Sequence, residues 1–442
     1  MKIFIHDEFN PEDMAMMQAL YSRSAESVEL HAEKVRKSGS GKFMESFYVG
    51  YGHASIGDCG STTLFIEGVS MLAAKAIQDW PLYSGQETSS RYIDMSKQAL
   101  VDPIGTPASA AVQKKWMDFY VSAQEKVKAH IRAKYPRKAD EDEKVYERAV
   151  KARAFDTLRA FLPAGITTQL SWHTNLRQAH DRNALLRYYP LAEIREISGI
   201  IQTKLQEKYP HSFVHKQYEK QEAYRKLLGE KYTFYSKKDY AGDFVAKTNI
   251  KKAELAEYSE LIKKRPEKTN LPVWMGELGN VAFDFLMDFG SFRDIHRHRN
   301  GTCRMPLLST KFGFNEWYLA ELPDDVRKEA KALIKEQTAA LKKIAASGAR
   351  KEDLQYLTAI GFNVSCRVSY GLPATIYVTE LRSGRLVHPT LRVIAHKMDK
   401  ALRKMFPGIV LFSDLSKDDW DVRRGKQDIV EKKPGMKTAI GM

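Results

Sequence analysis

The stretch TTLFIEGVSMLAAKAIQDWP, residues 62–81, joins two hydrophobic patterns in one short segment. Its first part, TTLFIEGV, is a short apolar run typical of a β-strand. From Ser70 onward the apolar residues recur at three- and four-residue spacing, which predicts an amphipathic helix. The hydroxyl of Ser70 suits a helix N-cap, and Pro81 is expected to end the helix. The stretch therefore predicts a strand followed directly by a helix.

A second stretch repeats this plan about 220 residues later. The run NVAFDFLM is followed by Asp288 as a candidate N-cap, and then by a helical pattern that leads into HRHRNG. Each cap lies nine residues before a tripeptide, residues 79–81 in the first stretch and residues 297–299 in the second. Residues 79–81 (Asp, Trp and Pro) therefore correspond to residues 297–299 (Arg, His and Arg).

Further matches keep the same order in both parts of the chain. They pair two long charged helices, then LRAFLPAGITT with CRVSYGLPATI, then HTNLRQ with VTELRS, and finally two closing helices that end in KYP and MFP. Shared order favours an internal duplication. We predict an α+β fold of two related halves, each an antiparallel sheet flanked by helices, packed as a pseudo-dimer. The expected units are residues 1–225, residues 226–421 and a basic mobile tail, residues 422–442.

Composition limits the class of protein. The 442 residues are 43% hydrophobic and carry a net charge of +15, which suits an anionic ligand but is equally typical of a basic, soluble surface. No apolar run is long enough for a membrane span, and the three cysteines lack the spacing of a zinc site or a disulfide framework. We expect a cytoplasmic protein without a structural metal.

The loop SGQETSSRY, residues 84–92, concentrates hydroxyls, a carboxylate and Arg91 after the first helix. A guanidinium together with hydroxyls and backbone N–H groups is suited to a phosphate monoester. An ordinary polar loop is the commoner explanation of such a pattern.

Residues 293–299 carry three arginines and two histidines. This density of positive charge favours a bound anion, such as a phosphate or a reduced flavin, although cations at a helix C-terminus also gain stabilisation from the helix dipole. A zinc site is not expected, because His296 and His298 should point to different helix faces. His53 in GHAS, taken alone, is more typical of a structural histidine.

Together, YVGYGHAS, SGQETSSRY, RAFLPAG and HTNLRQ resemble the flavin-dependent thymidylate synthase family, whose signature is R-H-R-x-x-S-x-N-E-x-S-x-R-Y. The first half keeps Ser84, Glu87, Ser89, Arg91 and Tyr92, with Gln86 in place of Asn, but has lost R-H-R. The second half keeps R-H-R and loses the loop apart from Thr302. The two halves together contain one set of the motif.

The resemblance implies roles for particular residues. Nucleotide contacts are implied for Ser84, Gln86, Glu87, Ser89, Arg91, Arg159 and Arg187, of which Ser89, Arg91 and Arg159 are the candidate catalytic residues. Within this set, Arg91 and Arg159 would bind the phosphate, and Ser89 would contact the edge of the substrate. Flavin contacts are implied for His53, Ser55, Asn175, Arg177, Arg297, His298, Arg299 and Arg382.

The implied activity is reductive methylation of dUMP to dTMP, with FAD as cofactor and with methylenetetrahydrofolate and NADPH as co-substrates. The family's sites lie between subunits, so we expect a homodimer equivalent to the family's tetramer. One alternative is a divergent flavoenzyme that acts on another pyrimidine nucleotide or on uridine in nucleic acid. Nucleic acid is thus a possible partner of this protein, but small-molecule substrates are favoured. Another alternative is a non-catalytic descendant that binds nucleotide or nucleic acid.

Overall fold

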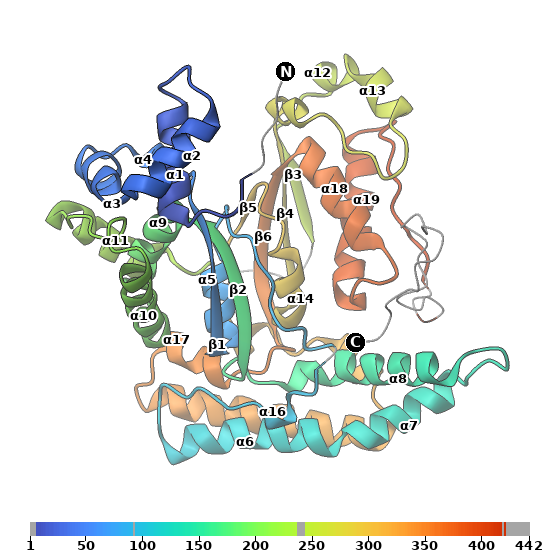
Figure 1. Cartoon of the computed structure of the whole chain (residues 1–442). Helices are drawn as coiled ribbons and strands as arrows, with labels where there is room; N and C mark the ends of the chain where they lie inside the picture. The colour runs from blue at the N-terminus through green and yellow to red at the C-terminus, as the bar shows by residue number, and fades with distance from the viewer. Residues whose placement is uncertain (1–5, 92, 237–243, 418–419, 421–442) are drawn as a thin grey trace.

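The structure is a computed structural model that describes residues 6–91, 93–236, 244–417 and 420 (Figure 1). The expected mobile tail, residues 422–442, and Tyr92 of the loop motif lie outside the described residues. No helix in the described part of the chain is both long and apolar enough to cross a membrane.

Two antiparallel sheets form the centre of the molecule (Figure 1). The first pairs β1 (Ser61–Ser70) with β2 (Thr167–Asn175). The second has the order β3-β4-β6-β5 and consists of β3 (Val245–Thr248), β4 (Asn280–Asp288), β5 (Thr302–Cys303) and β6 (Asn363–Gly371). The predicted α+β class is confirmed.

The two strand–helix units form as the sequence predicts. Helix α5 (Met71–Gln78) follows β1, and the Ser70 hydroxyl accepts a hydrogen bond from the Ala73 N–H at 2.9 Å. Helix α14 (Phe289–Ile295) follows β4, and the Asp288 carboxylate accepts one from the Ser291 N–H at 2.7 Å. Both caps satisfy N–H groups that have no partner within the helix. R-H-R therefore lies just beyond the end of α14.

Strand pairing in the two halves has the same register next to these helices. The last residue of β1 pairs with the first residue of β2, and the last residue of β4 pairs with the first residue of β6. Beyond each helix the chain returns along the far edge of the sheet, where Ser84 pairs with His173 and Thr302 with Ser369. One difference is a β-bulge in β1 near Gly68, whose φ of 69° suits glycine.

The halves meet through reciprocal backbone hydrogen bonds near the start of β2 and of β6. A two-fold interface pairs each contact with its converse, and the pattern here has this form. The donor and acceptor pairs are Ala164 N–H to Thr358 C=O (3.0 Å), Ile360 to Leu162 (2.9 Å), Gly165 to Tyr356 (2.9 Å) and Gly361 to Ala160 (2.8 Å).

Helices surround the two sheets (Figure 1). Across one end lie α6 (Pro107–Ser122), α7 (Gln124–Lys134), α8 (Glu143–Leu158) and α16 (Asp324–Ala346). Beside the first sheet lie α9 (Leu176–Leu186), α10 (Ala192–Lys208) and α11 (Glu219–Tyr232), and beside the second lie α18 (Leu372–Ser383) and α19 (Pro389–Met405). The N-terminal region contains α1 (Pro11–Tyr21), α2 (Val28–Ser38), α3 (Gly41–Phe43), the π-helix η1 (Met44–Gly50) and α4 (Ala54–Gly57). The short elements are η2 (Met95–Lys97), η3 (Arg159–Phe161), α12 (Lys252–Ala256), α13 (Ser259–Lys264), η4 (Val273–Leu278), η5 (Thr310–Phe312), α15 (Glu316–Ala320), α17 (Lys351–Leu354) and η6 (Gln355–Leu357).

Two of the predicted sequence matches are wrong. LRAFLPAGITT leads through η3 into β2, whereas CRVSYGLPATI runs from β6 into α18. HTNLRQ spans the end of β2 and the start of α9, whereas VTELRS lies in the last turns of α18. Arg382 is therefore not the structural counterpart of Arg177. The two predicted closing helices are confirmed: α10 and α19 each follow a strand and a helix, and each ends two residues before the predicted proline.

Candidate functional site

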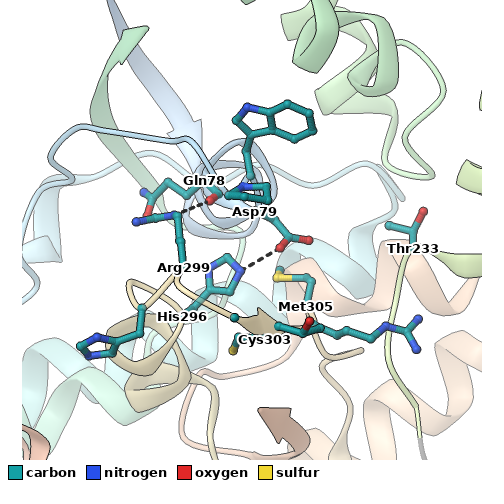
Figure 2. A pocket seen from close by; sticks show the side chains of 13 residues that line it. Gln78, Asp79, Thr233, His296, Arg299, Cys303 and Met305 are labelled. Atoms are coloured by element: carbon teal, nitrogen blue, oxygen red, sulfur yellow. Dashed lines mark hydrogen bonds and ion pairs between the residues drawn. The ribbon is translucent and has the colours of Figure 1, made fainter. Parts of the chain in front are cut away.

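A pocket of about 280 Å³ lies where the two halves meet beyond the ends of α5 and α14 (Figure 2). Its walls come from the end of α5 and the residues after it, from the residues after α14, from β5 with its neighbours, and from Thr233 after α11. The lining residues are Gln78, Asp79, Trp80, Pro81, Thr233, His296, His298, Arg299, Gly301, Thr302, Cys303, Arg304 and Met305. Both tripeptides that the sequence aligned, residues 79–81 and 297–299, thus contribute to the lining of one pocket.

The R-H-R residues contact both halves. The Arg299 Nε group donates to the backbone carbonyl of Gln78 at 3.2 Å, and its guanidinium lies 4.8 Å from the ring centre of Tyr83. His298 Nε2 accepts a hydrogen bond from Arg382 Nε at 2.7 Å. Burial and the charge of Arg382 lower the pKa of His298 to about 3, so its ring is neutral at physiological pH. Arg297 is half exposed and lies near Asp294.

Glu87 of the loop points inward and joins the halves. Its carboxylate accepts from Gln78 Nε2 at 2.9 Å, lies 3.0 Å from Lys75 Nζ and pairs with Arg293 of α14. Only 3% of the Glu87 side chain is exposed. Burial alone would raise the pKa of Glu87, but Arg293 and Lys75 lower it to about 2. The carboxylate is therefore fully engaged with protein groups.

Asp79 and His296 form a second pair between the halves. His296 Nε2 lies 3.0 Å from a carboxylate oxygen of Asp79 (Figure 2). Burial lowers the pKa of His296, although Asp79 opposes this effect. Burial would raise the pKa of Asp79, but His296, Arg182 and Arg299 lower it. A neutral imidazole therefore donates to an ionised carboxylate.

The two candidate phosphate arginines lie close to Asp156. Arg91 Nε donates to Asp156 at 2.6 Å, and its Nη1 group donates to the backbone carbonyl of Leu386 at 3.0 Å. Arg159 is 5% exposed, and its Nη2 group donates to the Ser291 hydroxyl at 3.2 Å. Burial opposes its charge, but Tyr318 and Asp156 raise the pKa of Arg159 above its usual value. Its Nε group has no hydrogen-bond partner among the described residues.

Several other predicted flavin residues gather where α4 meets α9. His53 and Ser55 are exposed, and Asn175 caps α9 by accepting from the Gln178 N–H at 2.8 Å. Arg177 forms a bidentate pair with Asp58 at 2.8 and 2.7 Å. One side chain links this group to the pocket: Trp80 Nε1 donates to Gln178 Oε1 at 3.0 Å.

The remaining predicted nucleotide residues lie along the loop and directly after α9. Ser84 and Gln86 are exposed, and Ser89 is half buried. The Arg91 N–H donates to the Ser89 hydroxyl at 3.4 Å. Arg187 follows α9 and lies 3.6 Å from Glu222 of α11. The structure thus places Ser84 to Arg91 on one loop and Arg187 on a different element.

The pocket can bind an anionic or strongly polar planar group. Arg299 supplies guanidinium donors, His296 has an unpaired Nδ1 acceptor, and Trp80, Cys303 and Met305 supply apolar surface. A flavin ring combines an apolar plane with hydrogen-bonding groups along one edge, and these residues fit such a ring. The pocket volume lies just below the usual range for small-molecule sites, so one ring system fits better than a whole dinucleotide.

Sequence reasoning assigned no individual role to Lys75, Asp79, Arg293 or His296, although Arg293 and His296 belong to the positive cluster at residues 293–299. A signal for one pair was present, because Asp79 stands where the first copy has lost an arginine and His296 precedes R-H-R in the second copy. An acidic residue in one copy and a histidine beside the corresponding position of the other could have suggested a contact between the halves.

Comparison with known proteins gives a family match to the first half of the chain. The family described as thymidylate synthase complementing protein matches residues 6–211. Over longer spans, the chain is 26% identical to a UPF0159 protein of Chlamydia muridarum, with 84% of this chain and 80% of that protein covered. It is 22% identical to a UPF0159 protein of Thermoplasma acidophilum, with 91% and 95% covered. Residues 6–211, just under half of the chain, therefore match the thymidylate synthase complementing protein family.

Proposed function

We propose that this protein is a flavin-dependent thymidylate synthase that converts dUMP to dTMP. In this proposal FAD is the cofactor, methylenetetrahydrofolate supplies the carbon, and NADPH supplies the electrons. The match of residues 6–211 to this family supports a role in thymidylate synthesis. The finer assignment rests on the arrangement of the divided motif.

The observation that carries the proposal is that the segment around R-H-R contacts the first half beside and within the nucleotide loop. Arg299 of the second half donates to the carbonyl of Gln78, the last residue of α5, six residues before the first-half loop begins. Arg293, four residues before Arg297, pairs with Glu87 within the loop. One chain thus places α14, which leads into the R-H-R of one copy, against the nucleotide loop of the other, which supports a single composite site.

The protein's own part in the reaction would be binding and electrostatics. Arg299 and Arg297 would hold the anionic flavin, which supplies hydride when bound. Arg91 and Arg159 would bind the nucleotide phosphate, and Ser89 would contact the edge of the pyrimidine. Arg91 is now paired with Asp156, so nucleotide binding would exchange this carboxylate for phosphate.

We further propose that two chains pair to complete the site. His53, Ser55, Ser84 and Gln86 are predicted ligand residues that are exposed in the single chain. A second copy placed over them would exclude water from the bound ligands, which strengthens electrostatic interactions.

The decisive experiment is the visible absorption spectrum of the full chain with FAD, followed by titration with dUMP. We expect bound flavin whose spectrum changes on addition of dUMP. Arg299→Ala should weaken FAD binding about tenfold or more, because a charged hydrogen-bond donor in a half-buried pocket is lost. Arg132→Ala, which removes an exposed ion pair with Glu147 on α7 and α8, is the matched control and should leave FAD binding unchanged.

Two outcomes would contradict the proposal. A chain that takes up no FAD would remove the cofactor from it, and equal FAD affinity in Arg299→Ala and the parent would mean that the cluster after α14 does not hold flavin. Turnover of dUMP in the presence of methylenetetrahydrofolate and NADPH would establish the reaction itself.

A further inference from the structure

His296 has one ring nitrogen that no protein group satisfies. Its Nε2 atom lies 3.0 Å from Asp79, and its Nδ1 atom is buried without a hydrogen-bond partner among the described residues. The residue is only 3% exposed, although it contributes to the wall of the pocket. A buried acceptor that lacks a partner costs stability, so such an atom in a pocket wall points to a ligand that supplies the missing donor.

The environment of His296 determines which nitrogen carries the proton. The carboxylate of Asp79 is kept ionised by Arg182 and Arg299, so it accepts a hydrogen bond from Nε2–H. Burial keeps the imidazole neutral, and Lys75 and Arg299 add to this effect. The Phe292 ring lies 5.0 Å from the imidazole on the same helical segment. Nδ1 is therefore an unprotonated acceptor in a ring whose orientation is fixed.

A donor lies in the same pocket. Arg299 uses Nε for the Gln78 carbonyl and Nη1 for the Arg297 carbonyl. Its Nη2 group has no protein acceptor among the residues that the structure describes. The residues that line the pocket thus include one with an unsatisfied acceptor, His296, and one with a cationic donor, Arg299, beside the apolar side chains of Trp80 and Met305.

We propose that the Asp79–His296 pair recognises the N–H group of a cyclic imide, with an adjacent imide carbonyl bound by Arg299. An imide presents a donor flanked by two acceptors on the edge of a planar ring, which complements this set of groups. Both a uracil ring and the isoalloxazine ring of a flavin contain such an edge. The inference rests on the proposed function for its choice of ligands, and it assigns a role to two residues outside the R-H-R tripeptide.

The test compares ligands that differ only at the imide nitrogen. Binding of lumiflavin and 3-methyllumiflavin, and of dUMP and N3-methyl-dUMP, is measured on the full chain by calorimetry. For one of the two rings, the N–H form should bind at least about tenfold more tightly than the methylated form, because methylation leaves Nδ1 unpaired. The pair that shows this preference identifies which ring the pocket takes.

Asp79→Asn is the informative variant, because it keeps the shape of the side chain. The amide of Asn would donate to Nε2 and drive the proton to Nδ1, which turns the acceptor into a donor. The preference for the N–H ligand should then disappear, and ¹⁵N-histidine spectra should show His296 changing from the Nε2–H to the Nδ1–H form. Asp118→Asn, at an exposed ion pair on α6, is the control and should retain both the preference and the tautomer.

The outcomes separate this inference from the proposed function. If the parent chain binds FAD and dUMP but does not discriminate against either methylated ligand, the inference is overturned and the proposed function stands. If discrimination depends on Asp79 but no dTMP is formed, the proposed function fails and the inference stands. Absence of binding by all four ligands would overturn the inference.

Discussion

Glu87 connects the nucleotide loop to the second half of the chain. Its carboxylate is buried with Lys75 and Arg293, and all three side chains are less than 10% exposed. Ionised groups in such a place are stable only as a set, because removal of one leaves an uncompensated charge. The pKa of Lys75 reflects the free-energy cost of burying a charged group, since burial lowers this pKa to about 8 despite the nearby carboxylate of Glu87.

We expect Glu87→Gln to lower the free energy of unfolding at pH 7 by about 3–5 kcal/mol. The parent should also lose stability in acid. The pKa of Glu87 is about 2 in the folded chain and 4.5 ordinarily, so the unfolded chain binds the proton more readily. Its stabilising effect is complete above about pH 4.5 and is lost as the pH falls toward 2.

Urea unfolding between pH 7 and pH 3 measures both effects. Glu87→Gln should be less stable at pH 7 and show a shallower loss below pH 4.5 than the parent. Glu336→Gln, which removes an exposed pair with Lys115, is the control and should change stability by less than about 1 kcal/mol. If the free energy of unfolding falls with pH to the same extent in the parent and in Glu87→Gln, the carboxylate of Glu87 is not the acid-sensitive group.

Individual residues of the site were predictable only where a local motif marked them. Arg299 and Glu87 belong to recognisable motifs, but their partners do not. Asp79 and His296 are 217 positions apart, and their contact depends on how the ends of two helices face each other across the halves. No periodic pattern contains that information.

At the scale of elements, the strand–helix units were predictable because their signals are local. Ser70 and Asp288 cap helices that their own neighbouring residues encode. The matches of LRAFLPAGITT with CRVSYGLPATI and of HTNLRQ with VTELRS were wrong for a physical reason. The short sequences LPA and LR occur in helix starts, helix ends and turns alike, so identical residues did not indicate the same secondary structure. Strand register, by contrast, aligns β2 with β6 although their sequences, TTQLSWHTN and NVSCRVSYG, differ.

The loop after α5 pairs with β2 along the edge of that strand that β1 does not occupy. Ser84 pairs with His173, the Ser171 N–H donates to the Gln86 carbonyl at 2.8 Å, and the Gln86 N–H donates to the Ser171 hydroxyl at 3.1 Å. Gly85 permits this approach, because a Cβ atom there would lie 1.9 Å from the Ser171 carbonyl oxygen. Backbone atoms cannot move aside as a flexible side chain can.

Gly85→Ala should therefore displace the loop from β2. We expect a loss of stability of about 1–3 kcal/mol and faster amide exchange in residues 84–91, together with a weaker response of bound flavin to dUMP. Gly199→Ala in α10 is the control: its Cβ would meet open space, so the helix should gain up to about 1 kcal/mol. Unchanged exchange in the loop of Gly85→Ala would show that pairing with β2 does not hold it.

At the scale of the whole molecule, the reciprocal hydrogen bonds near β2 and β6 make the halves interdependent. The Gly361 N–H donates to Ala160, and the Gly165 N–H donates to Tyr356, so the backbone of each half satisfies polar groups of the other. Trp116 adds a side-chain bond, because its Nε1 group donates to the Leu357 carbonyl at 3.1 Å. Separation of the halves would leave these buried groups unpaired.

We expect the two sheets to unfold in one cooperative transition, and Gly361→Ala to lower the stability of both. A Cβ atom at Gly361 would lie 2.4 Å from the Phe314 ring and 2.7 Å from the Ala160 carbonyl oxygen, which forces the halves apart at a cost of about 1–3 kcal/mol. Hydrogen exchange of peptides from β1–β2 and from β4–β6, measured across a urea series, should give one shared midpoint that shifts equally in both sheets. Gly276→Ala, in the second half but next to open space, should leave that midpoint unchanged. A shift confined to β4–β6 would mean that each half is stable without the other, and the composite site would then depend on docking of two independent domains.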